Sequence, residues 1–112
     1  MKDDARAHVF DLQQAACSAR AFVEGKTYEH YINDEQLRSA VERKFEIMGE
    51  ALNRLRRDDP ELLERIRDYR EIISFRNILV HGYDAIDDRI VWDIIQSDLP
   101  QLIEDVEKLL AG

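Results

Sequence analysis

Four side chains that could act together on a phosphodiester lie within eight residues of this 112-residue chain. They are Arg76, Asn77, His81 and Tyr83, in the stretch Ile72–Asp84, which reads IISFRNILVHGYD. An imidazole gives and takes protons near neutral pH, and the N–H fork of a guanidinium matches phosphate oxygens. This set suggests metal-independent cleavage of RNA. His81 would move protons to and from the 2′-hydroxyl and the leaving oxygen, Arg76 would hold the phosphate, and the Asn77 amide would orient the imidazole or a ribose hydroxyl.

The same residues also fit an ordinary helix end, with His81 bonded to a carbonyl and Arg76 in an ion pair. Apolar residues recur through the stretch at helical spacing, and Gly82 stands where the helix would end. Arg76 and His81 are five residues apart, so an ideal helix separates them by about 140°. A bend, or a second copy across a two-fold axis, could bring them together. One apolar face is expected to enter the core: Ile72, Phe75, Ile78 and Leu79.

No other cluster competes as a reactive site. The three histidines His8, His30 and His81 are too scattered for a zinc site, so we expect neither a metal nor a cofactor. The one cysteine, Cys17, cannot form an internal disulfide and is expected to be a small buried side chain. The chain contains no run of about 18 apolar residues, the length that would suggest a membrane span. The N-terminus does not have the pattern of a signal peptide. A cytoplasmic protein is expected.

The remaining chain must form the scaffold that positions this stretch, and its patterns are helical throughout. Hydrophobic residues make up 45% and charged residues 36%, with four glycines and two prolines. These values predict a single domain, residues 1–112, with an all-α fold: an up-and-down bundle of four main helices plus short helices. The expected helices cover about 3–23, 34–57, 60–68, 69–81 and 88–110, and residues 27–32 are expected to form a short helix or a turn.

Local signals mark where these helices begin and bend. Asn33 or Asp34 can cap the second long helix, Asp59 the helix that starts at Pro60, and Asp87 or Asp88 the last helix. Gly49 lies inside the second long helix, where it costs about 1 kcal/mol relative to alanine. A close helix crossing there would explain it. Pro100 should kink the last helix, and Trp92 should be half-buried.

The charge is unevenly distributed. The net charge is -8, of which residues 84–112 carry -6 through eight acidic and two basic side chains. The total argues against a general nucleic-acid binder. Seven arginines nevertheless gather in one segment, as a local basic surface or as a solvated face with acidic partners: Arg54, Arg56, Arg57, Arg65, Arg67, Arg70 and Arg76.

Glu46 and Glu50 stand one turn apart on the second long helix. They either line a cleft at the site and pair with Arg76, or form ordinary pairs on a solvated helix face. The sequence leaves both interpretations open.

The stretch Arg76–Tyr83, RNILVHGY, resembles the R-x4-H-x-Y signature of the HEPN superfamily, specifically the HepT-like (DUF86) toxins. The resemblance extends to FEIMGEAL at Phe45–Leu52 and to VWDII and SDLP within Asp84–Pro100. It covers most of the chain from about Asp34 to Leu110. The motif itself shows no departure from the family pattern.

The resemblance implies a homodimer with both motifs in a cleft at the interface. It also implies that this chain is the toxin of a type VII toxin–antitoxin pair. Such a toxin is a ribonuclease, and its partner is a nucleotidyltransferase-fold (MNT) antitoxin. That antitoxin would silence the toxin by AMPylation of Tyr83, since AMP groups add negative charge and bulk beside Arg76 and His81. Two other functions stay open: a non-catalytic binding subunit of a nucleotidyltransferase, and a structural helical dimerisation module.

Overall fold

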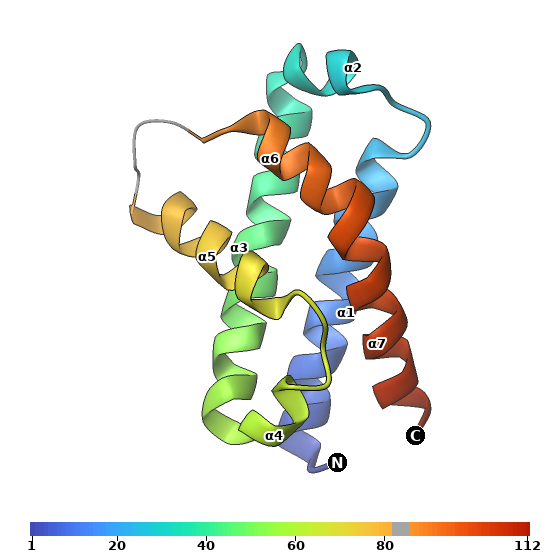
Figure 1. Ribbon diagram of the computed structural model, residues 1–112, viewed down its shortest axis with the longest axis vertical. Coiled ribbons are helices and arrows are strands. Elements are labelled where there is room, and N and C mark those ends of the chain that lie inside the picture. The colour runs from blue at the N-terminus through green and yellow to red at the C-terminus, as the bar shows by residue number, and fades with distance from the viewer. Residues whose placement is uncertain (82–85) are drawn as a thin grey trace.

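Two long helices run side by side along the molecule and carry about half of its buried apolar residues (Figure 1). They are α1, Asp3–Val23, and α3, Glu35–Asp58. The last helix, α7, Leu99–Ala111, packs against α1. This computed structural model describes residues 1–81 and 86–112, and within those ranges every regular element is helical. The predicted all-α fold is confirmed.

Side-chain caps set where the helices begin. Asp34 accepts a hydrogen bond from the Leu37 N–H at 3.0 Å and so starts α3. Asp59 accepts from Leu62 at 3.1 Å and starts the short helix α4, Pro60–Leu63. Thr27 and His30 form a reciprocal capping box on α2, Tyr28–Ile32. Asp87, not Asp88, caps α6, Asp88–Asp93.

The helix that we predicted to continue from Pro60 to about Asp68 ends at Leu63, so that prediction was wrong. The following turns are tied to α7 instead. The Arg67 backbone N–H donates to Asp105 Oδ2 at 2.9 Å, and its guanidinium binds the same carboxylate. Asp68 then adopts a φ of +65°, which is incompatible with a continuing helix. The long-range contact with Asp105 could not be read from local spacing.

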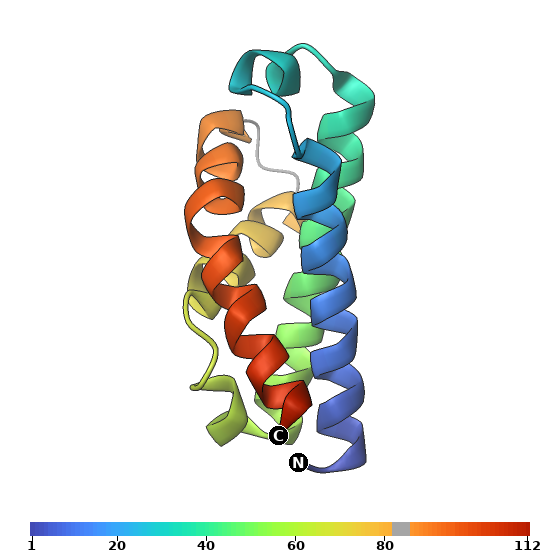
Figure 2. The same ribbon diagram turned by 90° about the vertical axis from the view of Figure 1, so that its right-hand side faces the viewer.

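The last helical segment bends where a kink was predicted. A π-helical turn, Ile94–Asp98, joins α6 to α7 just before Pro100 (Figure 2). Proline lacks an N–H and its ring crowds the carbonyl four residues earlier, and a widened turn accommodates both. Trp92 is half-buried as expected, with its ring centroid 5.6 Å from that of Tyr31.

Apolar residues recur at helical spacing along α1 and α3, and those that form these two stripes are all buried and meet in one core. Cys17 is the exception to the predictions on α1, because it is exposed. Its neighbour Ala16 takes the inward position, and each helical residue turns by about 100°. Cys17 therefore faces outward. The residues that form the buried stripes are Ala5, Val9, Leu12, Ala16, Ala19 and Val23 on α1, and Leu37, Val41, Phe45, Met48, Leu52 and Leu55 on α3.

Candidate active site on the projecting end of α5

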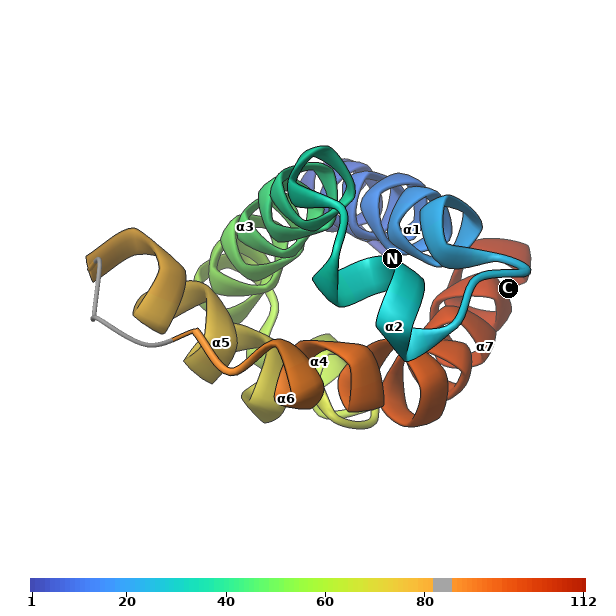
Figure 3. The same cartoon turned by 90° about the horizontal axis from the view of Figure 1, so that it is seen from above.

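The helix α5, Tyr69–His81, crosses α3 and carries the candidate reactive residues. Its first half is anchored in the core. The Phe75 ring is 4% exposed and packs edge-on against Phe45, with ring centroids 5.3 Å apart. The second half stands clear of the other helices, as the view from above shows (Figure 3). One helix thus joins a buried anchor to a projecting end.

The projecting end exposes apolar side chains. Ile78 is 36% exposed and Val80 48%, while Leu79 is half-buried. Our prediction that Ile78 enters the core was therefore wrong, and Leu79 enters it only in part. The helical pattern continues, but α5 extends beyond the helices that cover its first half (Figure 3). This surface is one that a further protein chain could cover.

Arg76 lies across α3 at Gly49, and this confirms the close helix crossing predicted there. A methyl group built on Gly49 would overlap Cβ and Cγ of Arg76 and lie 3.1 Å from its Cδ. The aliphatic part of Arg76 thus fills the space above the glycine. Its Nε atom is buried and has no hydrogen-bond partner among the residues that the structure describes. The side chain as a whole is 24% exposed.

The two terminal nitrogens of Arg76 reach polar neighbours. Nη1 donates to Asn77 Oδ1 at 3.4 Å, and Nη2 lies 4.0 Å from Glu50 Oε1. Glu46 pairs instead with Arg43, at 3.1 Å. Of the two glutamates, Glu50 therefore contacts Arg76 and Glu46 does not. Both side chains are partly exposed and the two atoms are 4.0 Å apart, so this contact holds the guanidinium only weakly.

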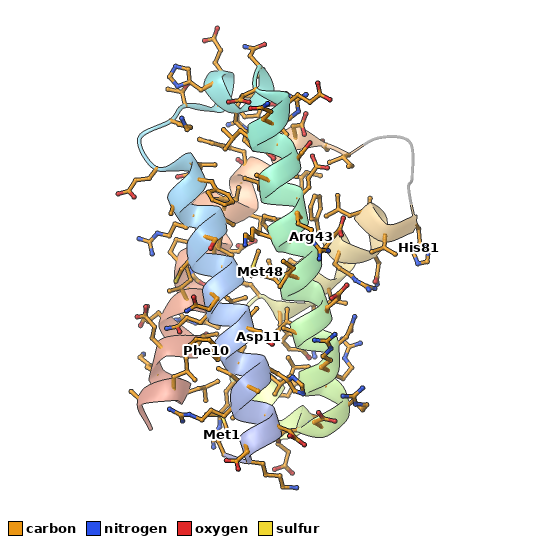
Figure 4. All side chains as sticks on the ribbon, turned by 180° about the vertical axis from the view of Figure 1, so that it is seen from behind. Met1, Phe10, Asp11, Arg43, Met48 and His81 are labelled. Atoms are coloured by element: carbon orange, nitrogen blue, oxygen red, sulfur yellow. The ribbon has the colours of Figure 1, made fainter. Side chains whose placement is uncertain are left out.

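His81 is the last described residue of α5 and is exposed at the projecting end, away from the bundle (Figure 4). Asn77, one turn earlier, is exposed as well. The structure thus brings Arg76, Asn77 and Glu50 together, and leaves His81 one turn beyond them. Gly82 and Tyr83 lie outside the described residues.

The arginine-rich segment is partly neutralised by acidic partners. Arg67 binds Asp105 at 2.9 Å, and Arg57 binds Asp58 at the same distance. Arg70 pairs with Glu64 at 3.4 Å. Several arginines of this segment thus have acidic partners, as expected for a solvated helix face. Arg76 lies at the edge of the segment, where a local basic surface was the other interpretation.

Within residues 1–81 and 86–112, no group of histidine, cysteine and acidic side chains is arranged to hold a metal ion. No helix in the same ranges is both long and apolar enough to cross a membrane.

Comparison with known proteins agrees with the sequence signature. A family described as "Ribonuclease HepT-like" matches residues 12–109. A Methanocaldococcus jannaschii protein named "Putative RNase MJ1380" is 33% identical over 106 residues, which cover 95% of this chain and 96% of that protein. A Thermococcus cleftensis protein named "Probable ribonuclease HepT" is 30% identical, with 97% of this chain and 98% of that protein covered. No solved structure matches the chain.

Proposed function

Because this chain belongs to the family of HepT-like ribonucleases, we propose that it is a metal-independent endoribonuclease with its active site at the projecting end of α5. The observation that carries the proposal is the shared position of Arg76, Asn77 and His81 on the last turns of this helix. The guanidinium already contacts one carboxylate, Glu50, at 4.0 Å. A phosphate offers the same oxygen chemistry to the same donors.

The reaction would be an internal transfer at phosphorus. His81 would accept the proton of the ribose 2′-hydroxyl as its oxygen bonds to phosphorus, and the bond from phosphorus to the 5′-oxygen would break. A protonated imidazole would return a proton to that leaving oxygen. Arg76 would bind the non-bridging oxygens, where negative charge accumulates in the transition state. Asn77 would orient the imidazole or a ribose hydroxyl, and Glu50 and Glu46 would line the cleft.

The proposal extends to a second copy of the chain and to a regulator. The exposed Ile78 and Val80 would be covered in a symmetric homodimer, which would bring the two motifs into one cleft. The protein would act in the cytoplasm as the toxin of a type VII toxin–antitoxin pair. Its nucleotidyltransferase-fold antitoxin would transfer AMP to Tyr83 and block the RNA backbone by charge and bulk.

RNA cleavage by purified protein in EDTA tests the activity. We expect His81→Ala to lower the cleavage rate about 10²–10⁴-fold, the usual contribution of a positioned acid or base, and Arg76→Ala to act similarly. Two matched controls should keep wild-type rates: His30→Ala, in the α2 capping box, and Arg70→Ala, in the exposed first turn of α5.

Two outcomes would contradict the assignment. Full cleavage by His81→Ala at unchanged helix content would remove the imidazole from the mechanism. A wild-type protein whose Tyr83 is unmodified by mass spectrometry, and which cleaves no RNA and arrests no growth when expressed alone, would instead favour a binding subunit of a nucleotidyltransferase.

A further inference from the structure

Gly49 lies in the middle of α3, at the point where α5 crosses it. Helix propensity favours alanine over glycine at such a position, so the glycine needs another explanation. The structure supplies one, because the stem of Arg76 occupies the space where a side chain at Gly49 would be. The contact involves Cβ, Cγ and Cδ, which are the part of Arg76 nearest its own backbone and the least able to move aside.

This contact decides where the guanidinium lies. With its stem held against α3, Arg76 has its Nε buried and its two terminal nitrogens directed to Asn77 and Glu50. Contact along three successive stem atoms restricts the staggered rotamers that the side chain can adopt. A residue on a different helix therefore limits where the Arg76 stem can lie.

We propose that Gly49 is a positioning residue for RNA cleavage: its missing side chain sets the depth and direction of the Arg76 guanidinium. This inference rests on the proposed function. Carbon atoms in contact are normally about 3.5–4.0 Å apart, so a methyl at Gly49 would shift the Arg76 stem or separate α3 from α5 by about 1 Å or more. Misplacing a catalytic group by about 1 Å can reduce a rate about 10²-fold.

Single-turnover and steady-state cleavage by Gly49→Ala test the proposal. We expect kcat to fall about 10²-fold while KM stays within about threefold. The reason is that the displaced guanidinium would stabilise the transition state less, with little change in substrate binding. The matched control is Ala19→Val, which also adds bulk between packed helices, at a fully buried position on α1, a helix that packs on α3 and α7. This control should retain the wild-type kcat even where its melting temperature falls as far as that of Gly49→Ala.

A spectroscopic measurement makes the result independent of catalysis. The buried Arg76 Nε–H should give a ¹⁵N-resolved NMR signal that exchanges slowly with water, identified by its absence in Arg76→Lys. We expect Gly49→Ala to shift this signal and speed its exchange, and Ala19→Val to leave it unchanged.

Each outcome has a defined meaning. Wild-type kcat in a folded Gly49→Ala, or an unchanged Nε–H signal, overturns the positioning role. If the wild-type protein cleaves no RNA, the proposed function fails, while the NMR comparison still tests whether Gly49 holds Arg76. If Gly49→Ala does not fold, rapid exchange of the Nε–H in the wild type overturns the inference and protection supports it.

Discussion

In the first half of α5, Ile72 and Phe75 are 0% and 4% exposed, whereas in the second half Ile78 and Val80 are 36% and 48% exposed. Both halves have similar apolar content and belong to one continuous helix. Their surroundings differ because the bundle covers α5 up to its crossing with α3 at Arg76 and leaves the end beyond that crossing largely uncovered. The comparison shows that helical periodicity predicts which face of a helix is apolar. It does not predict whether the same chain or another chain covers that face. The candidate active site starts at this crossing with Arg76 and continues onto the open end with Asn77 and His81.

The largest effect should come from the anchored half. Phe75→Ala removes a buried ring that packs on Phe45, and we expect it to lower the free energy of unfolding by about 3–5 kcal/mol. Ile78→Ala, on the projecting half, should lower it by about 1 kcal/mol or less. Urea denaturation at a protein concentration that keeps the chain monomeric measures both. Equal losses for the two variants would mean that the halves of α5 do not differ in burial.

A charge on the projecting half tests the proposed homodimer. Ile78→Asp should weaken self-association about 30-fold or more, the equivalent of about 2 kcal/mol, because an unpaired carboxylate would enter an apolar interface. Phe10→Asp is the matched control, since Phe10 is 51% exposed on α1, away from the end that carries His81 (Figure 4). Sedimentation equilibrium measures both. A dimer that survives Ile78→Asp and dissociates with Phe10→Asp would place the interface on α1.

The smallest effect should be the loss of stability at acidic pH that Asp58 causes at the end of α3. Asp58, at the end of α3, accepts from Arg57 and lies 2.7 Å from His8 Nε2 on α1, and these contacts lower the pKa of its carboxyl to about 2. A carboxyl whose pKa is lower in the folded protein stabilises the fold above its unfolded pKa, about 3.9. That contribution is lost as the pH falls from about 4 to about 2.

Thermal unfolding of wild type and Asp58→Asn across that interval measures this contribution. We expect the wild type to be the more stable protein at pH 5, and the difference in melting temperature to shrink as the pH falls toward 2. A difference that stays constant with pH would show that the contacts of Asp58 do not depend on its ionisation. The projecting half of α5 takes no part in this cluster, so Ile78→Ala should not alter the pH dependence.

Much of the fold follows from local signals along the chain. The apolar repeats of α1 and α3, the caps at Asp34 and Asp59, and the irregularity before Pro100 depend on neighbours within a turn or two. Such interactions are short in sequence, so a single sequence contains them. The end of α4 was mispredicted because it depends on the contact between Arg67 and Asp105, 38 residues apart. Cys17 was misplaced because it borders the buried stripe.

The sequence by itself determined the residue types of the candidate site, their helix and the presence of a glycine at a helix crossing. It also determined the family, through the signature from Arg76 to Tyr83. Only the tertiary structure decided which residue meets that glycine, that Glu50 and not Glu46 contacts Arg76, and that Ile78 stays exposed. These facts depend on where α5 crosses α3 and how far it extends beyond it. Which residues meet at the crossing follows from how the whole core packs, and no local stretch of the sequence records it.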